Sequence, residues 1–190
     1  MKALFLAAAA LVLAASAHAA DPAAKHYFGL NLTTPGEANF DINGRNVAND
    51  NHPRAVKLYA GLQFTPTWGA EAGYGAFGSW HAADPAPGAS YQTRLGSKVV
   101  YLAGRATMPL GESFALFGKA GLALNRLSQH DSLGHAAREN FVRPMAGGGL
   151  EWRLAPQVSA TAEYAYYGSR RGDGDRFTQQ KAEVGLAFKF

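Results

Sequence analysis

His130, Asp131 and Ser132 are consecutive and are the residue types of an activated serine nucleophile. A histidine can take the proton of a serine hydroxyl, and a carboxylate can orient that histidine. Here the three residues lie in a stretch rich in Ser, Gly and His, and no acid partner can be assigned to them from the pattern. We therefore interpret them as polar loop residues and assign no catalytic residue.

The sequence likewise contains no recognisable metal, thiolate or phosphate site. The remaining histidines after residue 19 are scattered without metal-ligand spacing: His26, His52, His81 and His135. Cysteine is absent, which excludes disulfides and thiolate chemistry. The glycines at 147–149 lie inside an alternating run and not before a helix, so they do not form a phosphate loop. We expect no enzyme, no metal and no cofactor.

The charged residues do follow a pattern, because they occupy alternate positions in short runs. The clearest run is 181–190, in which every even position from Ala182 to Phe190 is apolar. Lys181, Glu183 and Lys189 take odd positions. Alternation with a period of two is the signature of a strand with one apolar and one polar face.

Seven earlier runs repeat this alternation: 27–33, 56–65, 68–77, 94–108, 114–125, 145–154 and 158–167. Short turns are predicted at 66–67, 109–113 and 155–157, and long loops at 34–54, 80–93, 128–140 and 169–179. Strands joined alternately by long and short connections predict a barrel with both termini at the periplasmic end. Pro144 cannot donate to a ladder, so we expect it above the bilayer or at a bulge.

The charges fall on one face of these strands, namely Lys57, Glu71, Arg105, Lys119, Glu151, Arg153, Glu163, Lys181, Glu183 and Lys189. The other face carries no charge in mid-strand, and a cation facing lipid at the bilayer midplane costs about 2–4 kcal/mol. A soluble barrel such as a lipocalin has the reverse arrangement. The sequence therefore predicts an all-β, eight-stranded antiparallel up-and-down transmembrane β-barrel. Aromatic residues at the strand ends predict an interfacial girdle: Phe64, Trp68, Trp152, Phe188 and Phe190.

The N-terminus predicts export. Lys2, an apolar run and the site Ala17-His18-Ala19 form a signal peptide over residues 1–19, which leaves 20–190 as one barrel domain. No later segment reaches 18 apolar residues, so no membrane helix is expected. The net charge is +4 and the basic residues are dispersed, which argues against nucleic-acid binding.

Several stretches resemble the OmpA-like transmembrane domain of Gram-negative outer membranes, in the order and spacing of that family. They are residues 142–164, Trp68-Gly-Ala-Glu-Ala-Gly-Tyr74, Leu116-Phe-Gly-Lys-Ala-Gly-Leu122 and Val184-Gly-Leu-Ala-Phe-Lys-Phe190. The resemblance covers about residues 26–190. It places the chain in the porin-like barrels of the cell envelope, in the outer membrane.

The resemblance implies a salt-bridge network that plugs or gates the lumen, formed here by Glu71, Arg105, Lys119 and Glu163. It also implies that Phe188 and Phe190 form the signal read by the barrel-assembly machinery. The chain ends at the barrel, so we expect no periplasmic peptidoglycan-binding domain. An eight-stranded barrel is filled by its own side chains, so we expect no wide permanent pore.

Arg94 and Lys98 fall on the outward face at the extracellular end of the fourth strand. They could bind phosphates of lipopolysaccharide or be solvated at the rim. We expect a monomeric structural protein of the outer membrane, in contact with its lipids, with weak gated channel activity as a possible addition. The alternatives are an adhesin or ligand-binding barrel acting through the extracellular loops and, less favoured, a lipid A-modifying enzyme using Ser132.

Overall fold

The computed structural model describes residues 25–33, 40–42, 45–46, 55–83, 92–131, 136–171 and 176–190. These residues form the strands β1 (Lys25–Thr33), β2 (Phe40–Ile42), β3 (Arg45–Asn46), β4 (Ala55–Gln63), β5 (Trp68–Ala83), β6 (Gln92–Leu110), β7 (Phe114–Asp131), β8 (Ala136–Ala155), β9 (Val158–Arg171) and β10 (Arg176–Lys189). No helix in the described ranges is long and apolar enough to cross a membrane. The predicted signal peptide, 1–19, lies outside these ranges.

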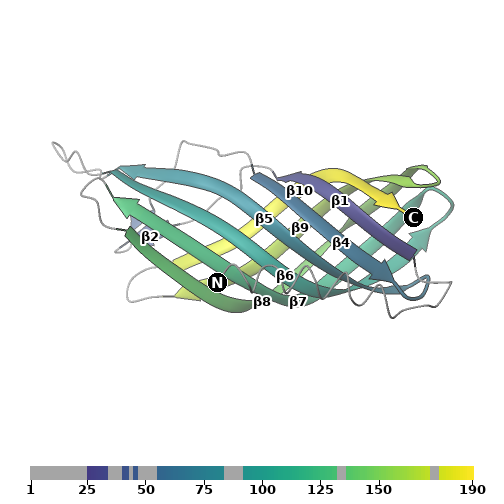
Figure 1. Cartoon of the computed structure of the whole chain (residues 1–190), viewed down its shortest axis with the longest axis horizontal. Helices are drawn as coiled ribbons and strands as arrows, with labels where there is room; N and C mark the ends of the chain where they lie inside the picture. Colours follow the sequence, from purple (N-terminus) through teal and green to yellow (C-terminus); the bar gives the residue numbers. More distant parts are fainter. Residues whose placement is uncertain are drawn as a thin grey trace.

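The strands close into a barrel because β1 pairs with both β4 and β10. Each strand from β4 to β10 pairs antiparallel with the next along the chain, so β1 and β4–β10 form an eight-stranded up-and-down barrel (Figure 1). The fold prediction is confirmed. The short strands β2 and β3 form a hairpin that pairs with the start of β10, where Phe40 lies opposite Phe177.

The two ends of the barrel differ. At one end, which we call the turn end, short connections at 64–67, 111–113 and 156–157 join neighbouring strands. His26 and Phe190 exchange backbone hydrogen bonds of 3.1 and 3.0 Å at this end, which closes the seam between β1 and the C-terminus. The opposite end is the loop end. In outer-membrane barrels the short turns are periplasmic and the longer loops extracellular.

The strands are longer than predicted toward the loop end. β5 has 16 residues, β6 19, β7 18 and β8 20, whereas a tilted strand crosses a bilayer in about 9–11 residues. The predicted loops at 80–93, 128–140 and 169–179 are therefore too long, because strand residues occupy their flanks. The loop predicted at 34–54 likewise contains β2 and β3. Outside the bilayer the outward face need not be apolar, so the alternation that marks a strand disappears there.

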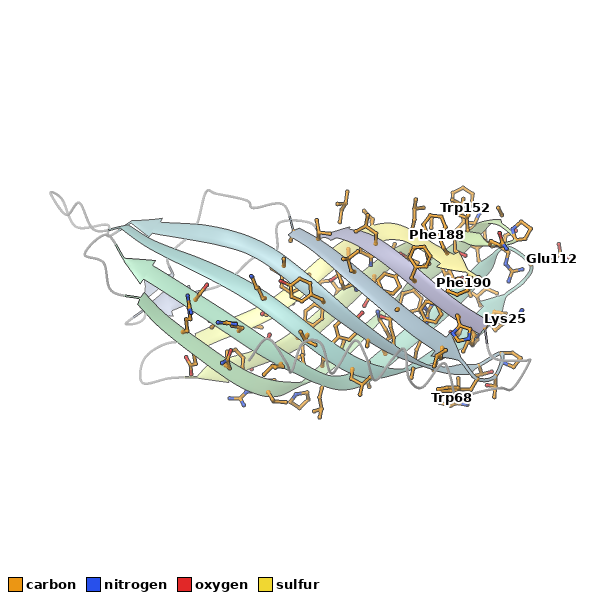
Figure 2. All side chains as sticks on the ribbon, viewed as in Figure 1. Lys25, Trp68, Glu112, Trp152, Phe188 and Phe190 are labelled. Carbon is orange, nitrogen blue, oxygen red and sulfur yellow. The ribbon has the colours of Figure 1, made fainter. Side chains whose placement is uncertain are left out.

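The barrel has an apolar exterior and a charged interior. Phe28, Leu30 and Leu102 are among the outward side chains exposed by 45–62%, and Leu62 shares this face but is buried. Inward positions are occupied by buried charges instead, as predicted. Trp68, Trp152, Phe188 and Phe190 gather at the turn end (Figure 2), where Phe114 stacks on Trp152 with ring centroids 6.0 Å apart.

The wall is unpaired between β8 and β9 toward the loop end. Their ladder stops at Ala146 and Tyr166, although β8 continues to pair with β7 and β9 with β10. Pro144 lies just beyond this stop, where its missing N–H interrupts no bond to β9. Two side chains replace the ladder: the Asn125 amide donates to the Tyr167 carbonyl at 3.0 Å, and Arg143 Nε donates to the Ser169 carbonyl at 3.0 Å.

Candidate functional site

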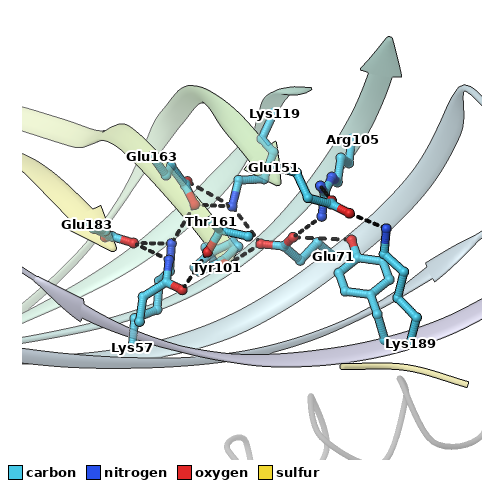
Figure 3. Close-up of polar contacts among 12 residues, drawn as sticks. Lys57, Glu71, Tyr101, Arg105, Lys119, Glu151, Thr161, Glu163, Glu183 and Lys189 are labelled. Carbon is cyan, nitrogen blue, oxygen red and sulfur yellow. Dashed lines mark hydrogen bonds and ion pairs between the residues drawn. The ribbon is translucent and has the colours of Figure 1, made fainter. Parts of the chain in front are cut away.

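Eight alternating charges cross the lumen as one connected series, which we call the ion chain (Figure 3). In order from the turn end its members are Lys189, Glu151, Arg105, Glu71, Lys119, Glu163, Lys57 and Glu183. They come from β10, β8, β6, β5, β7, β9 and β4. Inward alternation presents each side chain to the lumen, and the register of the strands sets which charges meet.

The half of the ion chain nearer the turn end centres on Arg105. Lys189 pairs with one oxygen of Glu151, and Arg105 Nη2 donates to its other oxygen at 2.7 Å. Arg105 Nη1 lies 3.6 Å from Glu71 Oε2. The guanidinium also lies over the Phe117 ring, 4.3 Å from its centroid, so a cation–π contact adds to its two carboxylate contacts.

The other half continues from Glu71 through two lysines. Lys119 Nζ lies 2.7 Å from Glu71 Oε1 and 2.7 Å from Glu163 Oε1. Lys57 Nζ lies 2.9 Å from Glu163 Oε2 and also pairs with Glu183. Each lysine therefore joins two carboxylates on different strands, and the wall is cross-linked through its centre.

The ion chain is buried and electrically balanced, with four cations and four carboxylates. Its side chains are exposed by 6% or less, apart from Lys189 at 23%. Buried charges are costly unless paired, and removing one partner of a buried pair typically costs about 3–5 kcal/mol. The arrangement therefore holds the strands in one register and fills the lumen.

The structure brings together the four residues that the family resemblance implied. Arg105, Glu71, Lys119 and Glu163 are consecutive members of the ion chain. The sequence also placed the other four members on the inward face but assigned them no contact. Alternation gives the face of a residue, whereas the contact depends on strand register, which alternation leaves open. The inward Arg153 proves exposed at the turn-end rim, where it donates to the Glu112 carbonyl at 3.0 Å.

A second group of side chains fills the lumen on the loop side of the ion chain. We call Phe77, Tyr101 and Tyr167 the aromatic layer; each is 2% exposed or less. The Tyr167 ring lies 5.4 Å from that of Phe77 and 6.0 Å from that of Tyr101, between centroids. The Tyr101 hydroxyl donates to Glu71 at 2.5 Å and the Tyr167 hydroxyl to Glu183 at 2.8 Å. The aromatic layer is therefore hydrogen-bonded to the ion chain.

The other predicted residues lie at the two ends. Lys98 is exposed on the outward face of β6, and Arg94 lies four residues toward the loop end of the same strand, with its side chain outside the described part. Phe188 stacks on Phe28 with centroids 5.1 Å apart, and Phe190 is 70% exposed at the turn end.

The candidate nucleophile cannot be placed as a unit. The backbones of His130 and Asp131 lie at the loop end of β7, whereas Ser132 and their side chains are outside the described residues. Among the described side chains, no group of three His, Asp or Glu residues could hold a metal ion.

Comparison with known proteins agrees with this geometry. A family model described as the outer membrane protein β-barrel domain matches residues 5–190. Outer membrane protein A of Klebsiella aerogenes is 24% identical over 136 residues, which cover 70% of this chain and 37% of that protein. The chain thus spans well under half the length of this relative.

Solved structures share the fold at low identity. The N-terminal β-barrel domain of Pseudomonas aeruginosa OprF matches with a TM-score of 0.57 and 15% identity, over 88% of this chain and 97% of that one. Ail, the attachment invasion locus protein of Yersinia pestis, solved with the heparin analogue sucrose octasulfate, matches with a TM-score of 0.54, 15% identity and the same coverage. The chain therefore belongs to the outer membrane protein β-barrel family, because its family model matches residues 5–190 and the structure is a closed barrel with an apolar exterior and a charged lumen. It is an OmpA-like barrel of the outer membrane.

Proposed function

We propose that the chain is a structural barrel of the outer membrane whose lumen is closed, and that it conducts ions weakly and only when its interior rearranges. The observation that carries this proposal is the unbroken ion chain, which joins seven of the barrel strands through buried side chains. An ion crossing the lumen would have to displace at least one of these pairs.

The aromatic layer supports the same proposal from a different direction. Phe77 offers an ion no polar group, and the hydroxyls of Tyr101 and Tyr167 are already hydrogen-bonded to Glu71 and Glu183. An eight-stranded barrel has an interior that its own side chains fill. Conduction therefore needs both the ion chain and the aromatic layer to move.

The first test is solute flux through the purified protein. We would refold the barrel into lipid vesicles loaded with a small fluorescent anion, verify folding by the heat-dependent gel mobility of barrels, and measure dye release. Dye release equal to that of dye-loaded vesicles without protein supports the closed barrel. Release that rises in proportion to the protein-to-lipid ratio contradicts it.

Biogenesis is part of the proposal. Residues 1–19 would direct export and be removed, and Phe190 would present the C-terminal signal to the assembly machinery. In the closed barrel the backbone N–H and C=O of Phe190 are hydrogen-bonded to His26, so these groups are free to pair with another strand only before β1 and β10 close. We propose no enzymatic activity.

A second candidate function, ligand binding at the loop end, is favoured by the excess length of β5–β8. These strands run well past the length that a bilayer requires, so they carry a four-stranded wall into the medium. Ail, of similar fold, was solved with a heparin analogue. Binding of the refolded barrel to immobilised heparin, lost when residues 34–54 are replaced by a short Gly/Ser linker, would support this function. Equal retention of both proteins would argue against a role for that segment.

A further inference from the structure

The apolar belt on the outside of β6, β7 and β8 ends abruptly in one row of residues. Val100, Leu124 and Val142 lie opposite one another on the outward face. The next outward residues toward the loop end are Lys98 and, directly opposite it, Arg126. The outward surface therefore changes from hydrocarbon to paired cations within one step along the strands.

The cations are joined by further donors. Asn140 lies opposite Arg126 and is exposed, and two residues beyond it the exposed Arg138 lies opposite Ser128. We call Lys98, Arg126, Asn140 and Arg138 the basic row. Lys98 and Arg126 point outward, because their neighbours Ser97 and Asn125 face the lumen and are 2% exposed or less. Asn140 and Arg138 are exposed and lie on the opposite alternation of β8 from the buried Met145.

Among the side chains that the structure describes, the basic row has no counter-charge on its own outward face. Among the described side chains, Lys98 and Arg126 form no ion pair, and the described carboxylates of the barrel strands, Glu139 included, lie on the inward alternation. Like charges directly opposite on neighbouring strands destabilise the pairing. An external anion placed between the two side chains removes this repulsion.

The position identifies the anion. From the aromatic residues at the turn end to Val100, Leu124 and Val142, the outward face matches an apolar band about 25 Å tall, as outer-membrane barrels have. The basic row therefore lies where lipid headgroups of the outer leaflet meet the wall. Arginine binds phosphate through two parallel hydrogen bonds, and lysine adds a point charge.

We propose that the basic row is a binding site for the phosphate of an outer-leaflet glycolipid, whose acyl chains lie along Val100, Leu124 and Val142. Lys98 and Arg126 hold the phosphate, and Asn140 and Arg138 donate from the adjoining strand. This assignment holds whether or not the lumen conducts. It extends the sequence-based suggestion for Lys98 to residues of β7 and β8 that the sequence did not single out.

The test is native mass spectrometry of the full barrel in detergent with added lipid. The probes are diphosphorylated lipid A and the same lipid after phosphatase treatment. Wild type is compared with Lys98→Gln/Arg126→Gln and with Lys25→Gln/Arg153→Gln, which removes the same charge from the turn-end rim. Heat-dependent gel mobility checks that each variant is folded.

We expect wild type and the turn-end variant to bind the phosphorylated lipid about tenfold more tightly than the dephosphorylated lipid, a difference of about 1.4 kcal/mol. Lys98→Gln/Arg126→Gln should lose that preference. Equal binding of both lipids by wild type, or an unchanged preference in this variant, overturns the proposal.

Two further probes separate the lipid from other anions. Free pyrophosphate should bind wild type far more weakly than the lipid, because it lacks the contacts to the apolar row. Pyrophosphate binding as tight as that of the lipid would make this a free-anion site. A heparin oligosaccharide that displaces the lipid at equal concentration would make it a polyanion site. Either result overturns the lipid assignment.

Discussion

The ring of Phe77 packs against the ring of Tyr167, with centroids 5.4 Å apart, and the hydroxyl of Tyr167 donates to Glu183 at the end of the ion chain. One side chain thus belongs to both barriers in the lumen. A movement that opens the aromatic layer must also break a hydrogen bond to a carboxylate. The two barriers are therefore in series and mechanically coupled.

Glu71 is the most heavily shared carboxylate of the ion chain, because it contacts Lys119, Arg105 and the hydroxyls of Tyr27 and Tyr101. Glu71→Ala leaves two buried cations without this partner. We expect the free energy of unfolding to fall by about 3–5 kcal/mol, measured by equilibrium urea titration of the barrel in lipid vesicles.

The matched control is Glu112→Ala, which removes a carboxylate from an exposed turn. Its free energy of unfolding should stay within about 0.5 kcal/mol of wild type. Similar losses in the two variants would show that the ion chain contributes nothing beyond an exposed charge.

Gly168 adopts φ of +107° beside the unpaired wall between β8 and β9, and a Cβ there would overlap the side chain of Arg143. Gly168→Ala should lower the free energy of unfolding by about 1–3 kcal/mol, since both strain and overlap oppose it. The control is Gly118→Ala, where a Cβ meets nothing within 4 Å. That change should be neutral or stabilise by up to about 1 kcal/mol. Equal urea midpoints for both variants would contradict the backbone geometry at Gly168.

The alternation of the strands within the bilayer made the barrel and its inward charges predictable from sequence. In 181–190 and 158–167 one face of the strand is turned toward lipid and the other toward the lumen, and the observed faces agree with the pattern. The extensions of β5–β8 were not predictable in this way. Beyond the apolar band the outward face need not be apolar, so no periodicity marks these parts of the strands.

The candidate site was predictable in part for a different reason. Alternation placed Lys57 and Glu183 on the lumen-facing side of their strands, but only the strand register brings them into one ion pair. The stop of the β8–β9 ladder at Ala146 and Tyr166 had a partial signal in Pro144, which was expected at an outer end or bulge. Of the basic row only Lys98 was singled out from sequence, because Lys98 and Arg126 are 28 residues apart and meet through the β6–β7 pairing.

A substitution at Phe190 should impair assembly into the membrane without changing the stability of the folded barrel. Phe190→Ser leaves its backbone bonds to His26 intact but removes the terminal ring. We expect the variant to refold in detergent with an unchanged urea midpoint, yet to accumulate at much lower levels in the outer membrane of producing cells. The comparison is Phe64→Ser, which removes an exposed ring from a turn at the same end. Equal membrane levels of these two variants would remove the special role of the C-terminus.

The central claim, two closures in series, is tested most directly by planar-bilayer conductance of four folded proteins. These are wild type, the ion-chain variant Glu71→Gln/Lys119→Gln, the aromatic variant Phe77→Ala/Tyr167→Ala, and the combination of all four substitutions. The ion-chain variant removes one cation and one carboxylate together, so it adds no net charge to the lumen. We predict that the first three proteins show little or no current and that the combined variant shows sustained discrete openings. Sustained openings in wild type, or an ion-chain variant that conducts as well as the combined one, would contradict the account.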